Sequence, residues 1–401
     1  MSEQLPINHP IAVGGDNSNP PPISGSVRSL KELIESVSGR GVSSPGDRED
    51  SGIAEALPFP FLAIVGQKEL KLALILALIN PALGGVLLLG PRGTGKTTAV
   101  RSLVDLLPKI PRSLCFYGCL PEDIETGGID AVCPDCAKKF AEGQPLSKMD
   151  RVRLVELPLN ARLEDVVGGI DERVAVHDRL RLKRGLLAQA DKNILYVDEV
   201  NLLADEVVDA LLDAAAQGSY TVRRGAVSAV FRSRFVLIGS MNPEEGKLRP
   251  QIQDRFGLRV IVSGLSDPQE RMEAYERVQL YLSKPRQLIN QYAETTAMVQ
   301  EEIQQARVAL PEVTLSPEAM QFGLKLISQL KIDSLRAEIT LFESGRAYAA
   351  ADHRSEASID DLKAIAPMAL RLRRSRFIEE YLQNQHAEEA ELIDIIAQSS
   401  K

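Results

Sequence analysis

The sequence predicts an α/β fold, a core with a five-stranded parallel sheet followed by a smaller all-helical C-terminal domain. Short apolar runs alternate with helical stretches and glycine turns as far as Asp267, and long helical patterns follow. Parallel strands are buried on both faces, so they form continuous apolar runs joined by crossover helices. The predicted strands are Val86 to Leu89, Leu154 to Leu157, Ile194 to Val197, Phe235 to Ile238 and Leu258 to Val262.

The composition suits two ordered domains, because 44% of the 401 residues are hydrophobic and 25% are charged, as in soluble globular proteins. We expect a flexible tail over residues 1–57, where Pro, Ser, Gly and Asn dominate, a core over 58–267 and the helical domain over 268–401. The net charge is −8 and there is no Trp. Nucleic acid is therefore not an expected partner.

Leu72 to Pro91 runs for twenty residues without a charge, which is long enough for a membrane span. Asn80-Pro81 and Gly84-Gly85 divide the run into a buried helix and a separate strand, so we expect no span. The N-terminus shows no basic segment followed by an apolar one, as a secretory signal requires. These observations predict a cytoplasmic protein, or one in an equivalent reducing compartment.

Other elements follow from local patterns. Leu203, Val207 and Leu211 share one face of a predicted helix, and the alternating segment from Tyr220 to Ser233, with Gly225 near its middle, predicts a hairpin. In the helical domain, Ser316-Pro317 and Ser358 have the features of helix starts. We expect the helices to break at Pro285, Pro311, Pro317 and Pro367.

A glycine-rich loop directly follows the first predicted strand and precedes a helical stretch: Gly90-Pro91-Arg92-Gly93-Thr94-Gly95-Lys96-Thr97. It matches the phosphate-binding P-loop, in which glycines let backbone N–H groups curl around phosphate oxygens. We expect Lys96 to reach the β and γ phosphates of ATP and Thr97 to offer its hydroxyl to Mg²⁺. The alternative is an ordinary glycine turn between a strand and a helix.

Two carboxylates, Asp198 and Glu199, end the third predicted strand, as in a Walker B element. We expect Asp198 to hold the Mg²⁺ shell and Glu199 to polarise the attacking water as a general base. The alternative is an ordinary helix N-terminus, where acidic residues are favourable.

Asn242 follows the fourth apolar run, within Ser240 to Pro243, where an Asn can hydrogen-bond the γ-phosphate and the attacking water. This is the sensor 1 role, although Asn-Pro is also a common turn. Arg249, Arg255 and Arg336 are candidates for contact with the γ-phosphate, because a guanidinium is always charged and binds phosphate through two hydrogen bonds.

All four cysteines, Cys115, Cys119, Cys133 and Cys136, lie within 22 residues and end in a C-x-x-C pair. Four thiols at this spacing suit a tetrahedral structural Zn²⁺. A redox-active dithiol and plain buried or surface thiols are the alternatives.

A basic cluster lies near the C-terminus and comprises Arg371, Arg373, Arg374 and Arg376. We expect a solvated surface there, with binding to an acidic partner as the alternative.

Together these residues resemble the ATPase I subunit of magnesium chelatase and its cobaltochelatase and MoxR-like relatives, of the AAA+ class. The resemblance rests on Phe61 to Gln67, Gly90 to Thr97, Leu157 to Leu159, Glu164 to Gly169, Val197 to Leu203, Gly239 to Gly246 and Leu248 to Gly257. It covers residues 59–260, and Leu335 to Thr340 resembles the family's sensor 2 segment. The segments beginning at Asn242 and Arg249 are far more specific than the P-loop, which many unrelated ATPases share.

The resemblance implies that Arg255 is an arginine finger acting on a neighbour's nucleotide and that Arg336 is the sensor 2 arginine of its own subunit. It implies a homo-oligomeric ring, a hexamer, in which ATP hydrolysis drives Mg²⁺ insertion into protoporphyrin IX for chlorophyll or bacteriochlorophyll synthesis. It also implies two partners, a D-type AAA+ subunit and a large porphyrin-binding H-type subunit.

The sequence departs from the family pattern in its longer tail and in the cysteine insert over 115–136, which the common chlorophyll-pathway subunit lacks in this form. The insert favours an alternative, a cobaltochelatase-like or MoxR-like remodelling ATPase with another client. A second alternative is a non-hydrolysing nucleotide-binding scaffold, against which Asp198, Glu199 and Arg255 argue together.

Overall fold

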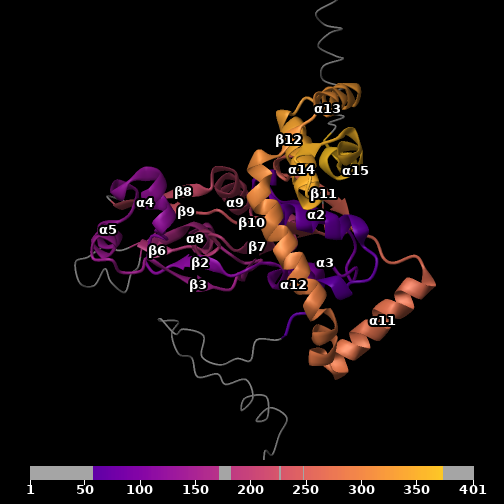
Figure 1. Cartoon of the computed structure of the whole chain (residues 1–401), viewed down its shortest axis with the longest axis horizontal. Helices are drawn as coiled ribbons and strands as arrows, with labels where there is room; N and C mark the ends of the chain where they lie inside the picture. The colour runs from indigo at the N-terminus through magenta and orange to yellow at the C-terminus, as the bar shows by residue number, and fades with distance from the viewer. Residues whose placement is uncertain (1–56, 171–181, 225–226, 247, 374–401) are drawn as a thin grey trace, which may run out of the picture. The chain divides into compact units, whose positions relative to one another are not determined.

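The core is a parallel sheet with the strand order β11-β1-β10-β7-β4. The computed structural model describes residues 57–170, 182–224, 227–246 and 248–373 (Figure 1). The strands of the sheet are β1 (Val86–Leu89), β4 (Leu154–Leu157), β7 (Ile194–Val197), β10 (Val236–Met241) and β11 (Leu258–Ile261). All five predicted strands are confirmed. They belong to one five-stranded sheet, so the predicted α/β fold class is confirmed too.

Helices cover both faces of the sheet, because alternate residues of each strand point to opposite sides. Val86 and Leu88 pack in one apolar cluster with α2 (Lys68–Ile79), and Leu87 and Leu89 pack in a second cluster on the other side. The first cluster also includes residues of α3 (Lys96–Ser102), α12 (Pro285–Ala309), α14 (Leu335–Ala351) and α15 (Ile359–Leu370). The second includes residues of α6 (Leu163–Val167), α8 (Leu186–Gln189), α9 (Asp205–Gln217) and α10 (Pro250–Arg255).

The long uncharged run is divided as the sequence predicts. Helix α2 ends at Ile79, the Asn80 side chain accepts a hydrogen bond from the N–H of Ala82, and the 3₁₀ turn η2 (Pro81–Leu83) leads to β1. Gly85 has φ of 91°, and a Cβ there would lie 2.7 Å from the carbonyl oxygen of Leu237. Within the described residues, no helix is long and apolar enough to cross a membrane.

The cysteine-bearing segment projects between two antiparallel strands, β2 (Ile110–Ser113) and β3 (Ser147–Asp150). It carries α4 (Pro121–Gly127), the 3₁₀ turn η4 (Ile129–Ala131) and α5 (Pro134–Ala141). The predicted hairpin is confirmed as β8 (Ser219–Arg224) paired with β9 (Val227–Arg232). A further antiparallel pair joins β5 (Gly168–Ile170) to β6 (Leu182–Arg184).

The C-terminal part is helical apart from one pairing of two-residue strands, β12 (Thr314–Leu315) with β13 (Glu356–Ala357). Its other helices are α11 (Pro268–Ser283) and α13 (Pro317–Gln329), after the 3₁₀ turn η6 (Leu310–Glu312). Both predicted helix starts are confirmed, because Ser316 caps α13 and Ser358 forms a capping box with Asp361.

The predicted break at Pro367 is wrong, because this proline lies inside α15. Pro367 is exposed, so the carbonyl group that it leaves without a helical partner can be solvated. Met368, Ala369 and Leu370 are buried, and their packing extends the helix by a further turn.

The expected solvated surface at the basic cluster is also wrong for Arg371 and Arg373. Arg371 pairs with Glu69 of α2, and the fully buried Arg373 guanidinium lies 2.8 Å from Asp254. Arg373 also donates to the carbonyl of Gly257, 3.0 Å away. Arg374, Arg376 and the expected tail, apart from Leu57, lie outside the described residues.

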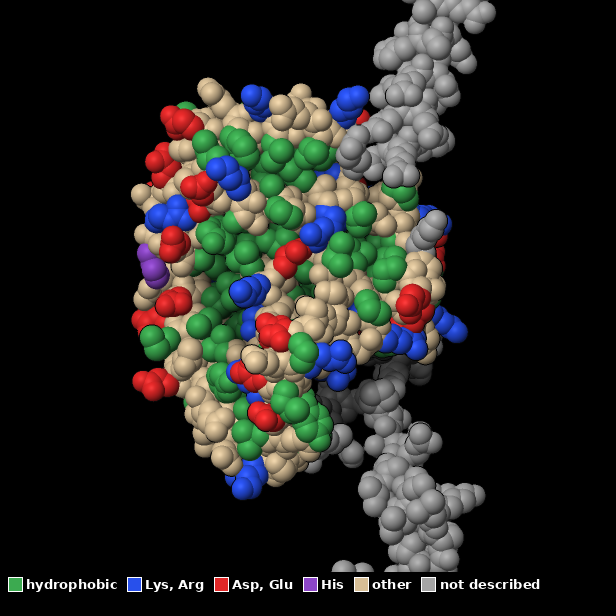
Figure 2. Space-filling view, turned by 90° about the vertical axis from the view of Figure 1, so that its right-hand side faces the viewer, with side chains coloured by type: hydrophobic (Ala, Val, Ile, Leu, Met, Phe, Trp, Pro, Cys, Tyr) green, Lys and Arg blue, Asp and Glu red, His purple; other side chains and the backbone are tan. Residues whose placement is uncertain are grey.

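Hydrophobic side chains gather between charged ones on the face drawn in Figure 2, which is the right-hand side of Figure 1. Helix α11 has no buried residue, and Met272, Tyr275, Val278 and Leu282 on it are exposed. Apolar patches of this kind commonly mark contact with another protein surface.

Candidate nucleotide site and thiol cluster

The glycine-rich loop is attached to the carboxyl end of β1, which lies between β11 and β10 in the sheet. Gly90 is required by a close approach, since a Cβ there would lie 2.0 Å from the carbonyl oxygen of Val262. Gly93 and Gly95 have φ of 77° and 84°, values that favour glycine. These conformations give the loop the curvature that exposes its N–H groups to an anion.

Lys96 lies buried inside its own loop, where its Nζ donates to the carbonyl oxygens of Gly90 at 2.6 Å and Pro91 at 2.7 Å. Burial lowers the pKa of this ammonium, and the Asp198 carboxylate acts in the opposite direction. The loop carbonyls thus hold a positive charge at its mouth, which is the environment that a phosphate group needs.

Asp198 and Asn242 follow β7 and β10, so they lie at the same edge of the sheet as the loop. The Tyr196 hydroxyl lies 2.9 Å from Asp198 Oδ1 and 3.2 Å from the Thr97 hydroxyl. Ser240 donates to the same Asp198 oxygen. Burial raises the pKa of Tyr196 to about 12, so this hydroxyl keeps its proton at neutral pH.

Glu199 and Asn242 are linked through Arg92 and Glu245. Arg92 lies 3.1 Å from Glu199 and 2.6 Å from Glu245, and Asn242 donates to Glu245 at 3.0 Å. Glu199 has a positive φ of 52° at the end of β7, and its N–H donates to Ser240 at 3.2 Å. Glu199 and Asn242 are therefore both connected to the P-loop residue Arg92, Glu199 directly and Asn242 through Glu245.

Sequence reasoning assigned no role to Tyr196, Glu245 or the Arg92 side chain. Tyr196 lies two residues before Asp198 on the same strand, and this period of two could have indicated its position. The contact between Arg92 and Glu245 joins two distant loops and has no local pattern that could have indicated it.

The three candidate arginines form ion pairs with carboxylates outside the nucleotide site. Arg249 pairs with Asp205, Arg255 lies 2.7 Å from Asp213 and 3.6 Å from Asp209, and Arg336 lies 3.4 Å from Asp254. Within the part of the chain that the structure describes, none of the three bonds to the P-loop.

The four cysteines converge, with all sulfur atoms within 4.8 Å of one another. The N–H of Cys119 donates to the Cys115 sulfur at 3.2 Å, and the N–H of Cys133 donates to the Cys119 sulfur at 3.3 Å. Hydrogen bonding from Cys119 lowers the pKa of Cys115 to about 4, whereas burial raises that of Cys136 to about 12. Four sulfur donors this close together suit a tetrahedral metal ion.

A P-loop after β1, with an amide at the end of the adjacent strand β10 and carboxylates at the end of β7 beyond it, defines a P-loop ATPase of the AAA+ class. Two protein-family models that match parts of the chain agree with this class. An AAA lid domain matches residues 324–395, and an MCM P-loop domain matches residues 169–258.

Curated relatives define the family. The magnesium-chelatase subunit ChlI homolog of Methanocaldococcus jannaschii is 42% identical over 322 residues, which are 80% of this chain and 87% of that protein. The magnesium-chelatase 38 kDa subunit of Acidiphilium rubrum is 41% identical, over 79% of this chain and 91% of that protein. Magnesium-chelatase subunit ChlI of Nostoc sp. is 39% identical, over 80% of this chain and 85% of that protein. The chain belongs to the ATPase I subunit family of magnesium chelatase.

A solved structure is similar over a comparable length. A chain in the cryo-EM reconstruction of the complex between subunits BchI and BchD of magnesium chelatase is 38% identical. The match covers 81% of this chain and 99% of that chain, with a TM-score of 0.46.

Proposed function

We propose that this ATPase is the motor subunit of a metal chelatase and couples ATP hydrolysis to insertion of Mg²⁺ into protoporphyrin IX. The observation that carries the proposal is the sequence identity of 39% to 42% to magnesium-chelatase I subunits, over 79% to 80% of the chain. The convergence of Lys96, Asp198 and Asn242 at one edge of the sheet supports it. The BchI–BchD complex supports a D-type partner for this chain, and the family implies a large H-type partner.

In this proposal, Lys96 and the loop N–H groups bind the phosphates of ATP, and Thr97 and Asp198 hold Mg²⁺. The metal neutralises charge on the phosphates when it is bound. Glu199 accepts a proton from the attacking water, and Asn242 orients that water and the γ-phosphate. Before this, Arg92 must release Glu199, because the ion pair occupies the carboxylate that has to contact the water.

The active sites are shared between subunits of a homo-oligomeric ring, which we propose to be a hexamer. Arg255 pairs with exposed carboxylates of α9 in its own chain and bonds to no described P-loop residue. It can therefore act on a neighbour's nucleotide. The exposed apolar side chains of α11 support contact between chains.

Porphyrin metallation tests the client. The purified chain is mixed with D-type and H-type subunits, ATP, Mg²⁺ and protoporphyrin IX, and the metallated product is followed by its fluorescence. Product that requires this chain and ATP supports the proposal. ATP turnover without any product, in a mixture where the established I subunit is active, would instead assign the chain to another client.

The thiol cluster favours a second candidate function, a cobaltochelatase-like or MoxR-like ATPase, because the insert is absent in this form from the common chlorophyll-pathway subunit. Replacing Mg²⁺ with Co²⁺, and protoporphyrin IX with a corrin precursor, in the metallation assay distinguishes the chelatases. The free thiols also support a cytoplasmic or otherwise reducing location.

We further propose that the four cysteines hold one structural Zn²⁺. Their sulfur atoms already lie within 4.8 Å of one another, and the surrounding apolar cluster is small, so a metal would stabilise a segment with little core of its own. Metal analysis after purification without chelators should give one zinc per chain, and loss of zinc after chelation should free four titratable thiols. Cys133→Ser should abolish zinc retention, and a metal-free wild type with four reactive thiols would contradict the proposal.

A further inference from the structure

A cavity of about 230 Å³ lies at the amino edge of the sheet, opposite the nucleotide site. Arg153 and Asn193, which line it, directly precede β4 and β7, whereas Asp198 follows β7. The other walls come from β2, α8 and the start of the cysteine-bearing segment. Its volume is several times the roughly 30 Å³ that one water molecule takes up.

The lining of the cavity is basic, although the whole chain has a net charge of −8. Its charged side chains are Arg112, Arg151, Arg153, Arg184, Lys192 and Asp191. Asp191 is already engaged, because it accepts hydrogen bonds from the backbone and the side chain of Arg234. The lining of the cavity thus carries five cationic side chains and one carboxylate, Asp191, which is already bonded to Arg234.

Some of these cations are neutralised by carboxylates nearby. Arg112 and Arg153 share Asp150, at 2.9 and 3.4 Å, and Lys192 lies 3.0 Å from Glu122. Arg184 and Arg151 form no ion pair within the described residues. These two guanidinium groups therefore lack a directly contacting carboxylate, although Asp191 attracts Arg184 and Asp105 attracts Arg151 at longer range.

Arg184 carries the argument, because its guanidinium is largely removed from solvent. One nitrogen donates to the carbonyl oxygen of Ala188 at 2.6 Å, but Nε is buried and has no hydrogen-bond partner in the described structure. Burial lowers the pKa of this group, and nearby Tyr220, Cys115 and Asp191 oppose that shift only in part. A buried guanidinium with an unsatisfied N–H is costly, and an anion that accepts from that N–H would reduce the cost.

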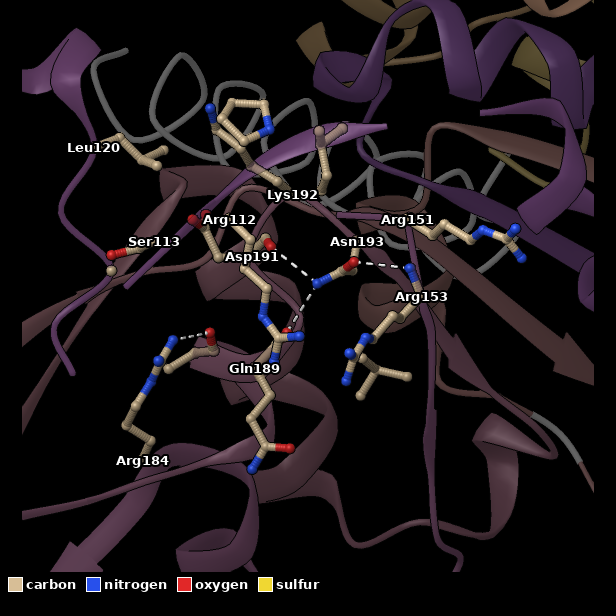
Figure 3. A pocket seen from close by; sticks show the side chains of 15 residues that line it. Arg112, Ser113, Leu120, Arg151, Arg153, Arg184, Gln189, Asp191, Lys192 and Asn193 are labelled. Carbon is tan, nitrogen blue, oxygen red and sulfur yellow. Dashed lines mark hydrogen bonds between the residues drawn. The ribbon is translucent and has the colours of Figure 1, made fainter. Parts of the chain in front are cut away.

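We propose that this cavity binds a small doubly charged oxyanion of the phosphate class. Figure 3 shows Arg184 at the lower left and Arg151 at the right, with the Arg151 side chain extending away from Arg184. A guanidinium binds two oxygens of such an anion at once, which suits Arg184 with its unused Nε. Ser113, Gly118 and Leu120 also line the cavity, so bound anion would fasten the cysteine-bearing segment to the sheet.

Inorganic phosphate is the probe, and isothermal titration of the full chain at low ionic strength is the measurement. The Lys96→Ala background weakens phosphate binding at the P-loop and so separates the two sites. We expect saturable binding of one phosphate per chain in this background. Arg184→Gln should weaken it at least tenfold. Arg286→Gln is the matched control, because Arg286 is an exposed arginine on α12 outside the cavity, and it should bind like its parent.

Arg151→Gln provides a variant that keeps the fold, because Arg151 is exposed, and it should weaken binding several-fold. Competition by malonate would show that the site accepts carboxylates as well, whereas competition by sulfate alone would restrict it to tetrahedral oxyanions. The proposal is overturned if Lys96→Ala binds no phosphate. It is also overturned if Arg184→Gln and Arg151→Gln both bind as tightly as Arg286→Gln.

Discussion

At the scale of single residues, the ends of β1, β7 and β10 bring together side chains with opposite charge and separate tasks. Lys96 is turned into its own loop by two carbonyl oxygens, and Glu199 is held by Arg92. Binding of ATP must therefore exchange these internal contacts for contacts with phosphate and water. Breaking the ion pair of Arg92 costs little free energy, because this side chain is exposed to water. Lys96 is buried, so its ammonium needs hydrogen-bond acceptors or an anion beside it to stay charged.

Substitution of Lys96 and of Glu199 should separate nucleotide binding from hydrolysis. Lys96→Ala removes the cation that faces the phosphates, so ATP affinity should fall at least tenfold. Glu199→Gln keeps the shape of the side chain but cannot accept a proton, so ATP should bind normally while turnover falls about a hundredfold or more. Fluorescent-nucleotide titration and phosphate release measure the two properties. Equal loss of ATP affinity in both variants would refute these roles.

At the scale of elements, ion pairs fix the helices that carry the candidate arginines. Asp254 on α10 lies 2.8 Å from Arg373 and 3.4 Å from Arg336 on α14, and it accepts a hydrogen bond from Ser334 at 3.0 Å. Burial acts to raise the pKa of Asp254, but the Ser334 hydrogen bond and the Arg373 charge outweigh it and hold the pKa below its usual value. The carboxylate therefore stays charged and joins the helix of Arg255 to the helix of Arg336.

Helix α15 offers a test of such a buried carboxylate. Asp361 caps the helix and lies 2.6 Å from Arg354, and its carboxylate is only 5% exposed. Asp361→Ala should destabilise the fold by about 2 kcal/mol, less than a fully buried pair, because Arg354 is partly exposed and screened. Asp360→Ala is the control, since this neighbour is 87% exposed. The thermal unfolding midpoint of Asp361→Ala should lie several degrees below that of Asp360→Ala. Equal midpoints would show that Asp361 does not stabilise the helix.

The stabilisation by Asp361 should also depend on pH. Burial acts to raise its pKa, but hydrogen bonds from Arg354 and Ser358 outweigh burial and lower the pKa below its usual value. Asp361 therefore stabilises the fold above the unfolded-state pKa of about 3.9, and this is lost as the pH falls through the lower folded value. The difference in unfolding midpoint between wild type and Asp361→Ala should shrink in that acid range. A difference that stays constant from pH 7 to pH 3 would contradict this linkage.

At the scale of the whole molecule, one chain supplies the P-loop and both carboxylates of a nucleotide site, but not an arginine bonded to that loop among its described residues. In the ring that we propose, the neighbouring subunit would supply Arg255 across the interface. A guanidinium placed there would stabilise charge on the transferring phosphoryl group, a contribution of about a thousandfold or more to turnover in comparable ATPases.

Mixing two inactive variants tests the shared site. Arg255→Ala and Glu199→Gln should each hydrolyse ATP poorly as pure proteins, because each lacks one half of the site. Mixed rings contain interfaces where an intact Glu199 faces an intact Arg255, so phosphate release should recover in part. Light scattering must first demonstrate co-assembly of the two proteins. Co-assembled rings without any recovery would count against a role in trans, and full turnover by Arg255→Ala alone would remove the residue from the site.

The sequence by itself determined the features that depend on neighbours along the chain. The five strands, the P-loop, the strand-end carboxylates and the caps at Ser316 and Ser358 were predicted correctly, because periodicity, capping and loop chemistry act over a few residues. The spacing of the four cysteines also predicted their convergence. These patterns identify which segments form each element.

Only the tertiary structure decided which distant residues meet. A cluster of arginines looks solvated in sequence, yet Arg373 is buried against Asp254, 119 residues away. Pro367 stays within α15 because the residues after it pack into the core. The unpaired charge of Arg184 likewise depends on how β2, β6 and the strand starts come together. The physical reason is the same in each case: the energy of a charge or of a helix end depends on burial and on partners, which the chain acquires only when it folds.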